Sequence, residues 1–425
     1  MSHTVNVLIF LAAFSALAFP SGYTLFPLIL ACGGWYLIVR SGSDILRGIE
    51  STSLAFIIVC WAYAITGIII DINHQVHLGA LEVYLPFLIY PSLIALYARF
   101  QPRFELLYFG AALGGIVAFI WILYVIFTSD VSRPSLHGTP ISFGNTGVLI
   151  AVTCAVTYAV SKDANSLKQH YSFLLVVGIV SGVGVSLLSG SKGGWISLVT
   201  VLVLFYWTAF FRLPRIQKIW IVVLIFSSSM LIIMHPSSIV NQRLLEAKSG
   251  IEYWIKTGTD HDGSVGARLN MYAFGISIAD RVPFFGLGAR GVDELWIEQA
   301  ALGKTDPNWA PNGIYSHAGN HLHNEFLTVY LWKGPFGLIA HLSVYLAAVV
   351  HFYRRRKSKD LIQRSAATLG LLTLICYAEF ALTDAGWYVN ANRQIFLFWI
   401  LTLVGVTMGP LKKRQQLTPS CKINS

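Results

Sequence analysis

The sequence predicts an all-α membrane protein that crosses a bilayer many times, and three observations support this fold class. Of the 425 residues, 55% are hydrophobic and only 12% are charged, whereas a soluble globular domain carries roughly 25% charged residues. The apolar residues gather in runs near the ~20 residues that a membrane-spanning helix needs. The runs also lack the ~10-residue alternating pattern that the strands of a membrane β-barrel require.

The apolar runs define about twelve predicted spans along the chain. They cover residues 5–20, 22–40, 52–71, 82–98, 104–128, 143–160, 171–189, 192–211, 217–235, 335–353, 365–383 and 394–409. The segment Ala16-Leu17-Ala18 resembles a signal-peptidase site, but no Lys or Arg precedes the first run. We therefore expect the first run to be retained as a helix.

The basic residues predict how the chain is oriented. Every even-numbered run is followed by cations, and the short loops on the other side hold few of them. These cations are Arg40, Arg47, Arg99, Arg103, Lys162, Lys168, Arg212, Arg215, Lys218, Arg354, Arg355, Arg356, Lys357, Lys359, Arg364, Lys412, Lys413 and Arg414. By the positive-inside rule both termini lie in the cytoplasm. The net charge of +10 is thus an orientation signal and does not indicate nucleic-acid binding.

One connection is much longer than the others and is predicted to face away from the cytoplasm. It runs from His235 to His321 and contains two expected helices, at 239–256 and 265–281. Gly286, Gly288 and Gly291 then indicate a turn or loop. The chain thus divides into spans one to nine (1–235), a helical outer loop (236–322), and spans ten to twelve with a basic tail (323–425).

Histidines gather where this loop re-enters the membrane. His317, His321 and His323 lie within seven residues of one another. A histidine there can act as a general base near neutral pH, two of them can hold a metal, or all can be tolerated interfacial residues. The spacing alone gives the three interpretations similar weight.

Cations near the outer face are candidates for binding an anion. Arg268, Arg281 and Arg290 lie in the outer loop, where guanidinium groups can bind phosphate or simply form surface ion pairs. Lys192 lies in Ser189-Gly190-Ser191-Lys192-Gly193-Gly194, where small residues let a lipid-linked headgroup approach the backbone. Its alternative role is that of a lysine extending to the membrane surface.

Acidic residues on the outer side give weaker signals. The triplet Asp260-His261-Asp262 can hold a divalent metal against a diphosphate, but such triplets are common by chance. Asp71, His74 and His77 in the second outer loop are similarly weak candidates.

Together the motifs of the outer loop resemble those of bacterial O-antigen ligases. His323-Asn324, a spacer of nine residues, Gly334, two residues and Gly337 match that family's signature. The polar segment from Arg268 to Gly288 is similar to the family's loop element with a functional arginine. Ser191-Lys192-Gly193 resembles the family's Ser-Arg-Gly, with lysine keeping the charge but losing the bidentate geometry.

The resemblance implies a glycosyltransferase C-like fold and an inverting, metal-independent transfer without a cofactor. The donor would be O-antigen polysaccharide on undecaprenyl diphosphate and the acceptor the lipid A-core, with membrane lipids around the enzyme. The reaction would occur at the periplasmic face of a bacterial inner membrane, as a step of lipopolysaccharide biosynthesis. His323 would be the base, and Arg268, Lys192 and Arg290 would hold the diphosphate. The sequence leaves open whether these residues converge.

Two further interpretations remain. O-antigen polymerases and protein O-oligosaccharyltransferases share the motif loosely, but the single large loop and the short C-terminal tail favour a ligase. A polysaccharide or lipid transporter has a similar number of spans. It usually shows repeated halves and polar groups in mid-membrane, whereas the polar candidates here gather at one face.

Overall fold

The computed structural model describes residues 1–129, 131, 133–163, 169–208, 239–258, 265–305 and 321–408, and all regular secondary structure in these ranges is helical. The α-helices are α1 (Ser2–Ala18), α2 (Gly22–Ser41), α3 (Ser43–Arg47), α4 (Ser51–Asn73), α5 (Leu85–Ile89), α6 (Leu93–Arg99), α7 (Phe104–Thr128), α8 (Pro140–Asp163), α9 (Gln169–Leu188), α10 (Lys192–Thr208), α12 (Ile239–Thr257), α13 (Val265–Ser277), α14 (Gly288–Ala301), α15 (Glu325–Arg355), α16 (Leu361–Ala381) and α17 (Asn390–Met408). The 3₁₀ helices are η1 (Leu78–Tyr84), η2 (Tyr90–Ser92), η4 (Ala279–Arg281) and η6 (Gly386–Tyr388).

Nine helical segments of the described residues are long and apolar enough to cross a membrane. The apolar α1 and α10 are shorter, with 17 residues each. The predicted span 217–235 lies outside the described residues, and every other predicted span coincides with a helical segment. The prediction of an all-helical polytopic membrane protein is therefore supported, while the count of twelve stays a prediction.

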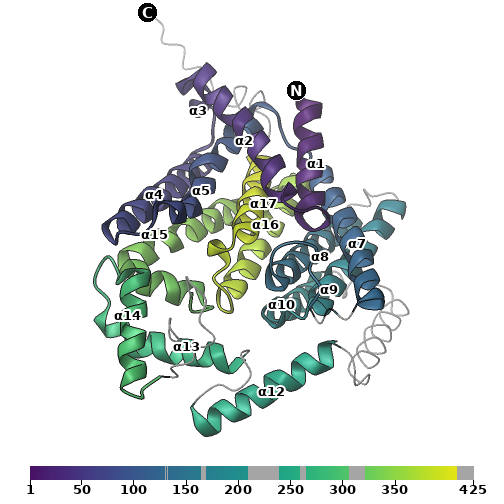
Figure 1. The fold of residues 1–425 in the computed structure, drawn as a ribbon. Coiled ribbons are helices and arrows are strands. Elements are labelled where there is room, and N and C mark those ends of the chain that lie inside the picture. The colour runs from purple at the N-terminus through teal and green to yellow at the C-terminus, as the bar shows by residue number, and fades with distance from the viewer. Residues whose placement is uncertain are drawn as a thin grey trace, which may run out of the picture.

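Helix α17 forms the centre of the bundle. Every residue from Ala391 to Met408 is buried, and Figure 1 shows α17 surrounded by other helices. A helix that is apolar on all sides is stable only when neighbours cover it completely. Its first turn starts directly after the loop that joins it to α16, and that loop contributes to the candidate site.

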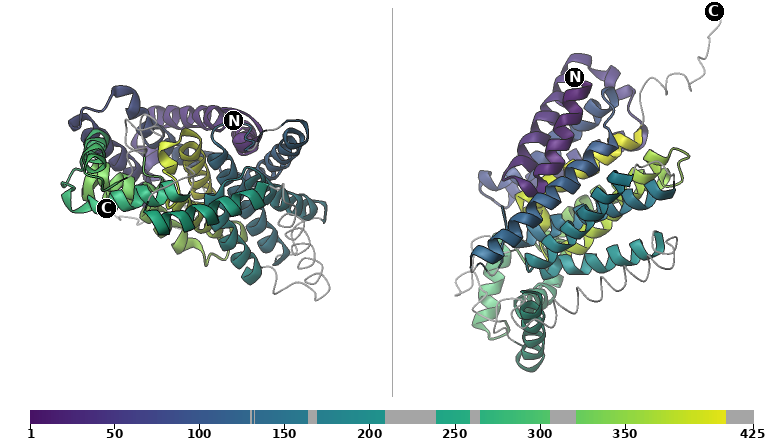
Figure 2. Two further views of the ribbon diagram at one scale, coloured as in Figure 1. Left: turned by 60° about the horizontal axis from the view of Figure 1, so that its bottom comes forward. Right: turned by 90° about the vertical axis from the view of Figure 1, so that its right-hand side faces the viewer.

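The helices of the outer loop lie together at one end of the molecule. In Figure 1, α12, α13 and α14 lie at the bottom, whereas α3 and the start of α1 lie at the top. Figure 2 shows the same separation from a second direction. This arrangement agrees with the sequence pattern, which assigns the outer loop and the α2–α4 connection to opposite sides.

The outer loop contains more helix than the sequence predicted. The expected helix 239–256 corresponds to α12, and 265–281 corresponds to α13 followed by η4. The expected loop at Gly291 is wrong, because α14 begins at Gly288. Val292 and Trp296 are buried on its inner face, and the Trp296 ring lies 4.2 Å from that of Phe274.

Helix α15 begins at Glu325, well before the predicted start of its span at residue 335. The predicted span covers residues 335–353 only and leaves out Lys333. However, Lys333 is buried and its Nζ lies 2.8 Å from the carboxylate of Asp71. The helix is instead kinked at Gly334, whose φ of 68° and ψ of −177° are not helical.

Candidate active site

His323 forms a hydrogen-bonded pair with Asp384. His323 Nδ1 lies 3.2 Å from Asp384 Oδ1, and the two side chains are 32% and 4% exposed. Burial alone would raise the pKa of Asp384. The hydrogen bond from His323, together with the charges of His321, His323 and Arg268, outweighs burial and lowers it. The carboxylate thus accepts the Nδ1 proton, which leaves Nε2 of His323 as the nitrogen that can accept another proton.

His321 orients the same pair from the other side. Its Nδ1 accepts the backbone N–H of His323 at 3.2 Å, and its Nε2 lies 3.9 Å from Asp384 Oδ1. Burial, followed by the charge of His323, lowers the pKa of His321 to about 4. His321 is therefore neutral near pH 7, and it supports the φ of 48° that His323 adopts.

The turn that presents His323 is fixed by the start of α15. Asn324 caps the helix, and its Oδ1 accepts the N–H of Leu327 at 3.0 Å. One residue later, buried Glu325 accepts the N–H of Trp387 at 2.8 Å. The Asn of the His-Asn motif is thus a capping residue, and Glu325 ties the turn to the loop that carries Asp384.

Helix α13 brings Arg268 to this pair. The hydroxyl of Tyr272, one turn after Arg268, lies 2.9 Å from the carbonyl oxygens of both His323 and Leu382. The charge of Arg268 acts on Asp384 and His321. Its Nε is buried and has no hydrogen-bond partner within the described residues, so it can bind an incoming anion.

Lys192 approaches from the first turn of α10. Gly193 lies against Thr383, the neighbour of Asp384, because a Cβ added at Gly193 would come within 2.5 Å of Thr383 Oγ1. Lys192 Nζ lies 3.3 Å from Glu246 Oε2 on α12, and the charge of Arg268 reaches it. The structure therefore brings Lys192, Arg268 and His323 to one region.

Arg290 does not join this region. Its side chain lies on α14, is 86% exposed, and pairs with Glu294, whose Oε1 is 3.2 Å from Arg290 Nε. Arg281 similarly pairs with Glu298 at 3.6 Å. Both arginines follow the surface ion-pair alternative that the sequence left open.

The two motif glycines, Gly334 and Gly337, are required for different structural reasons. A Cβ at Gly334 would lie 2.2 Å from the carbonyl oxygen of Phe284, so only glycine lets the outer loop rest on the kink of α15. Leu287 completes this contact by donating its N–H to the carbonyl of Leu331 at 2.8 Å. A Cβ at Gly337 would lie 2.2 Å from Cβ of Lys333, so this glycine makes room for the lysine.

The family comparison gives a match over the part of the chain that supplies most of these residues. Residues 177–342 match the protein family described as O-Antigen ligase. This match supports membership of the O-antigen ligase family. A domain of this family supports an enzymatic, ligase- or polymerase-type role in polysaccharide assembly. The matched region includes Lys192, Arg268 and His323, whereas Asp384 lies beyond it.

A curated relative extends the similarity over nearly the whole chain. A Haemophilus influenzae protein, itself described as uncharacterized, is 24% identical over 407 residues, which cover 94% of this chain and 96% of that protein. The region outside the ligase-family domain therefore also has a counterpart in that relative.

The weaker sequence candidates have structural roles or lie outside the described residues. Asp71 pairs with Lys333, and His74 Nε2 lies 2.9 Å from the carbonyl oxygen of Phe285. His77 accepts the N–H of Gly79. The triplet at 260–262 and His317 lie outside the described residues.

A metal ion can be held by the same groups that form the His–Asp pair. Ligand atoms of His321, His323 and Asp384 lie within 4.8 Å of one another. Two imidazoles and one carboxylate form a plausible zinc ligand set. The metal interpretation thus keeps a structural basis, and only an activity measurement separates it from the base interpretation.

Sequence reasoning missed Asp384, the partner of His323. It is an isolated acid after a long apolar run, which gives no local motif. One signal was available, because the loop between the last two predicted spans lies on the same predicted side as the outer loop. An acid there can meet a histidine of the re-entry segment.

Proposed function

We propose that this protein is an O-antigen ligase that moves polysaccharide from undecaprenyl diphosphate to the lipid A-core oligosaccharide. The observation that supports this most strongly is the His323–Asp384 pair, next to which lie the cations Arg268 and Lys192. A base beside a group of cations fits a transfer from a phosphate leaving group. Family membership supports the substrate class.

The proposed chemistry is a direct displacement. The acceptor hydroxyl attacks the anomeric carbon, the bond from that carbon to the diphosphate oxygen breaks, and Nε2 of His323 takes the hydroxyl proton. Asp384 keeps the Nδ1 proton in place and stabilises the imidazolium that forms. One displacement inverts the anomeric centre.

The diphosphate leaves with its negative charge, so it needs cations more than it needs an acid. Arg268 and Lys192 supply them, and the guanidinium can bind two phosphate oxygens at once. Arg290 is left out of this site because it is exposed and paired with Glu294. With two cations available the reaction proceeds without a metal in this proposal.

The proposal extends to fold and compartment. A glycosyltransferase C-like bundle in a bacterial inner membrane would present this site to the periplasm. There the donor arrives already activated, so no nucleotide is needed. The outer position of α12, α13 and α14 in Figure 1 fits an active site on that face.

The test is transfer by the purified protein in lipid nanodiscs, with defined carrier-linked glycan and lipid A-core as acceptor. We expect an inverted linkage to the core and a loss of about 10²- to 10⁴-fold in rate for His323→Ala. Retained transfer by His323→Ala would overturn the base assignment. Lengthening of the donor glycan would indicate a polymerase. Formation of a glycosylated peptide would indicate an oligosaccharyltransferase. Movement of the carrier across the membrane without transfer would indicate a transporter.

A further inference from the structure

Glu246 on α12 binds two cations through one oxygen atom. Its Oε2 lies 3.3 Å from Lys192 Nζ and 2.7 Å from Arg243 NH1. The two cations are largely covered, with side chains 14% and 19% exposed, whereas Glu246 is 40% exposed. A carboxylate from a peripheral helix therefore reaches inward to cations near the proposed diphosphate site.

Two more arginines, Arg133 and Arg268, belong to the same group of cations. Arg133 follows α7, and the charges of Arg243, Arg268 and Glu246 all act on it. Burial first, and then the charges of these arginines, lowers the pKa of Arg133. Side chains from four separate segments thus form a cation cluster, which we define as Arg133, Lys192, Arg243 and Arg268.

The cation cluster has more positive charge and more donors than Glu246 satisfies. Nε of Arg133 and Nε of Arg268 are buried, and neither has a hydrogen-bond partner among the described residues. Buried N–H groups are rarely left without an acceptor in proteins. Glu246 pairs directly with only two of the four cations, Lys192 and Arg243, which leaves the buried Nε groups of Arg133 and Arg268 for a larger anion.

We propose that Arg133 and Arg243 are further ligands of the donor diphosphate, and that Glu246 is an internal anion which the diphosphate displaces. This inference rests on the proposed function for the identity of the anion. A diphosphate offers several charged oxygens, so it can engage two guanidinium forks where Glu246 engages one. It therefore competes well for the cluster.

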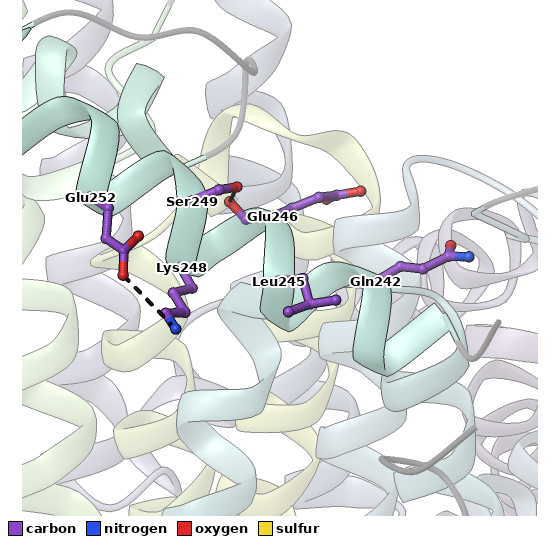
Figure 3. Close-up of a pocket in the computed structure, with 6 residues that line it drawn as sticks. All are labelled: Gln242, Leu245, Glu246, Lys248, Ser249 and Glu252. Carbon is purple, nitrogen blue, oxygen red and sulfur yellow. Dashed lines mark hydrogen bonds and ion pairs between the residues drawn. The ribbon is translucent and has the colours of Figure 1, made fainter. Parts of the chain in front are cut away.

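The position of Glu246 allows its carboxylate to separate from the cation cluster. Helix α12 borders an open hollow of about 610 Å³, which Figure 3 shows along one face of the helix, and its lining residues are Gln242, Leu245, Glu246, Lys248, Ser249 and Glu252. A partly exposed ion pair adds little to the stability of a structure, so Glu246 can be released at little cost. Helix α12 is also held to α13 further along, where Trp254 Nε1 donates to Asn270 Oδ1 at 2.7 Å. Releasing Glu246 would therefore leave α12 attached.

The experiment measures binding of inorganic pyrophosphate to the full-length protein in nanodiscs by isothermal titration calorimetry. Glu246→Gln keeps the shape of the side chain but removes the competing charge, and we expect the Kd to fall roughly three- to tenfold. Arg133→Ala should raise the Kd by a similar factor, and Arg133→Lys by less. An unchanged or higher Kd for Glu246→Gln would overturn the inference.

Helix α12 offers a matched control. Glu252 pairs with Lys248 at 3.9 Å on the same helix, but outside the cation cluster. Glu252→Gln should leave the pyrophosphate Kd unchanged, and an equal decrease would mean that α12 attracts anions only through its net charge. Melting temperatures of all variants show whether each one folds.

Pyrophosphate binding needs no transfer reaction, so the two proposals can fail separately. Tighter binding by Glu246→Gln in a protein that transfers no glycan would sustain the anion site and overturn the ligase function. Active transfer with an unchanged Kd for Glu246→Gln would sustain the ligase function and overturn the anion site.

Discussion

Asp384 Oδ1 lies 3.2 Å from His323 Nδ1, although 61 positions separate the two residues in the chain. The first residue lies in the loop before α17 and the second in the turn before α15. Their pairing determines which ring nitrogen of His323 is free, and each of the predictions below concerns this pair or the elements that hold it.

Asp384→Asn should lower kcat by about 10²-fold with little change in the KM for the donor. The amide can turn its NH₂ group toward Nδ1, which moves the ring proton to Nε2 and removes the base. A double-mutant cycle with His323→Ala checks this in the transfer assay. If the double variant is much slower than His323→Ala alone, Asp384 acts by another route.

Lys192→Arg should retain most transfer activity, whereas Lys192→Ala should lose at least about tenfold in kcat/KM, because one charge-assisted contact is worth roughly 1.5–3 kcal/mol. Lys248→Ala, on the exposed side of α12, serves as the control for loss of a cation. Equal activity of the Arg and Ala variants of Lys192 would remove this residue from the site.

EDTA should leave transfer unchanged, and added Zn²⁺ should inhibit it. Zinc bound by His321, His323 and Asp384 would occupy the ring that must accept the proton. Titration of activity with Zn²⁺, followed by reversal with EDTA, measures this effect, and Asp384→Asn should weaken it. A loss of activity in EDTA that Mg²⁺ or Mn²⁺ restores would instead support a metal-dependent mechanism.

The partly buried His321 should make the protein less stable as the pH falls. Its pKa is about 4 in the folded protein and 6.5 as an ordinary histidine, so only the unfolded chain takes up a proton in this range. Stability from this group is full above pH 6.5 and declines toward pH 4, by about 1.4 kcal/mol per pH unit at most.

The measurement is the drop in melting temperature between pH 7 and pH 5. This drop should be smaller for His321→Gln than for the wild type, while the exposed residue His3, changed to Gln, should have no effect on it. An equal drop in the wild type and in His321→Gln would show that His321 does not contribute to acid sensitivity.

Gly334→Ala should destabilise the protein strongly. A non-glycine residue at φ 68° and ψ −177° costs about 1–3 kcal/mol, and overlap with the carbonyl of Phe284 adds about 1–3 kcal/mol. Gly291→Ala is the control, since Gly291 lies inside α14 and its nearest contact would be 3.3 Å from Leu287. Thermal unfolding in detergent distinguishes the two. Similar melting temperatures would mean that the contact between the loop and α15 adds little.

Sequence patterns predicted those parts of the molecule that depend on periodicity and on local motifs. Runs of apolar residues located the helices, and the His-Asn signature located His323. The predicted start of the tenth span at residue 335 was too late, because α15 begins at Glu325 and includes Lys333, whose charge is paired with Asp71, a residue distant in sequence. The sequence alone does not show that a lysine inside a helix is neutralised by a distant acid.

The composition of the candidate site was predicted in part, for a related reason. Arg268, Lys192 and His323 occur in short recognisable segments, so residue type and spacing identified them. Asp384, Arg133, Arg243 and Glu246 have no such segment around them. They can be recognised as site residues only when the folded bundle brings the separate outer segments together.

The hydroxyl of Tyr272, shared between the carbonyl oxygens of His323 and Leu382, constrains how substrates can enter. An outward movement of α13 would break these contacts with the two turns that hold His323 and Asp384. We therefore expect Arg268, one turn before Tyr272 on α13, to stay beside the base while substrates enter. Helix α12 contacts this side of the site through the partly exposed Glu246 ion pairs, so we expect a bulky lipid-linked glycan to enter there.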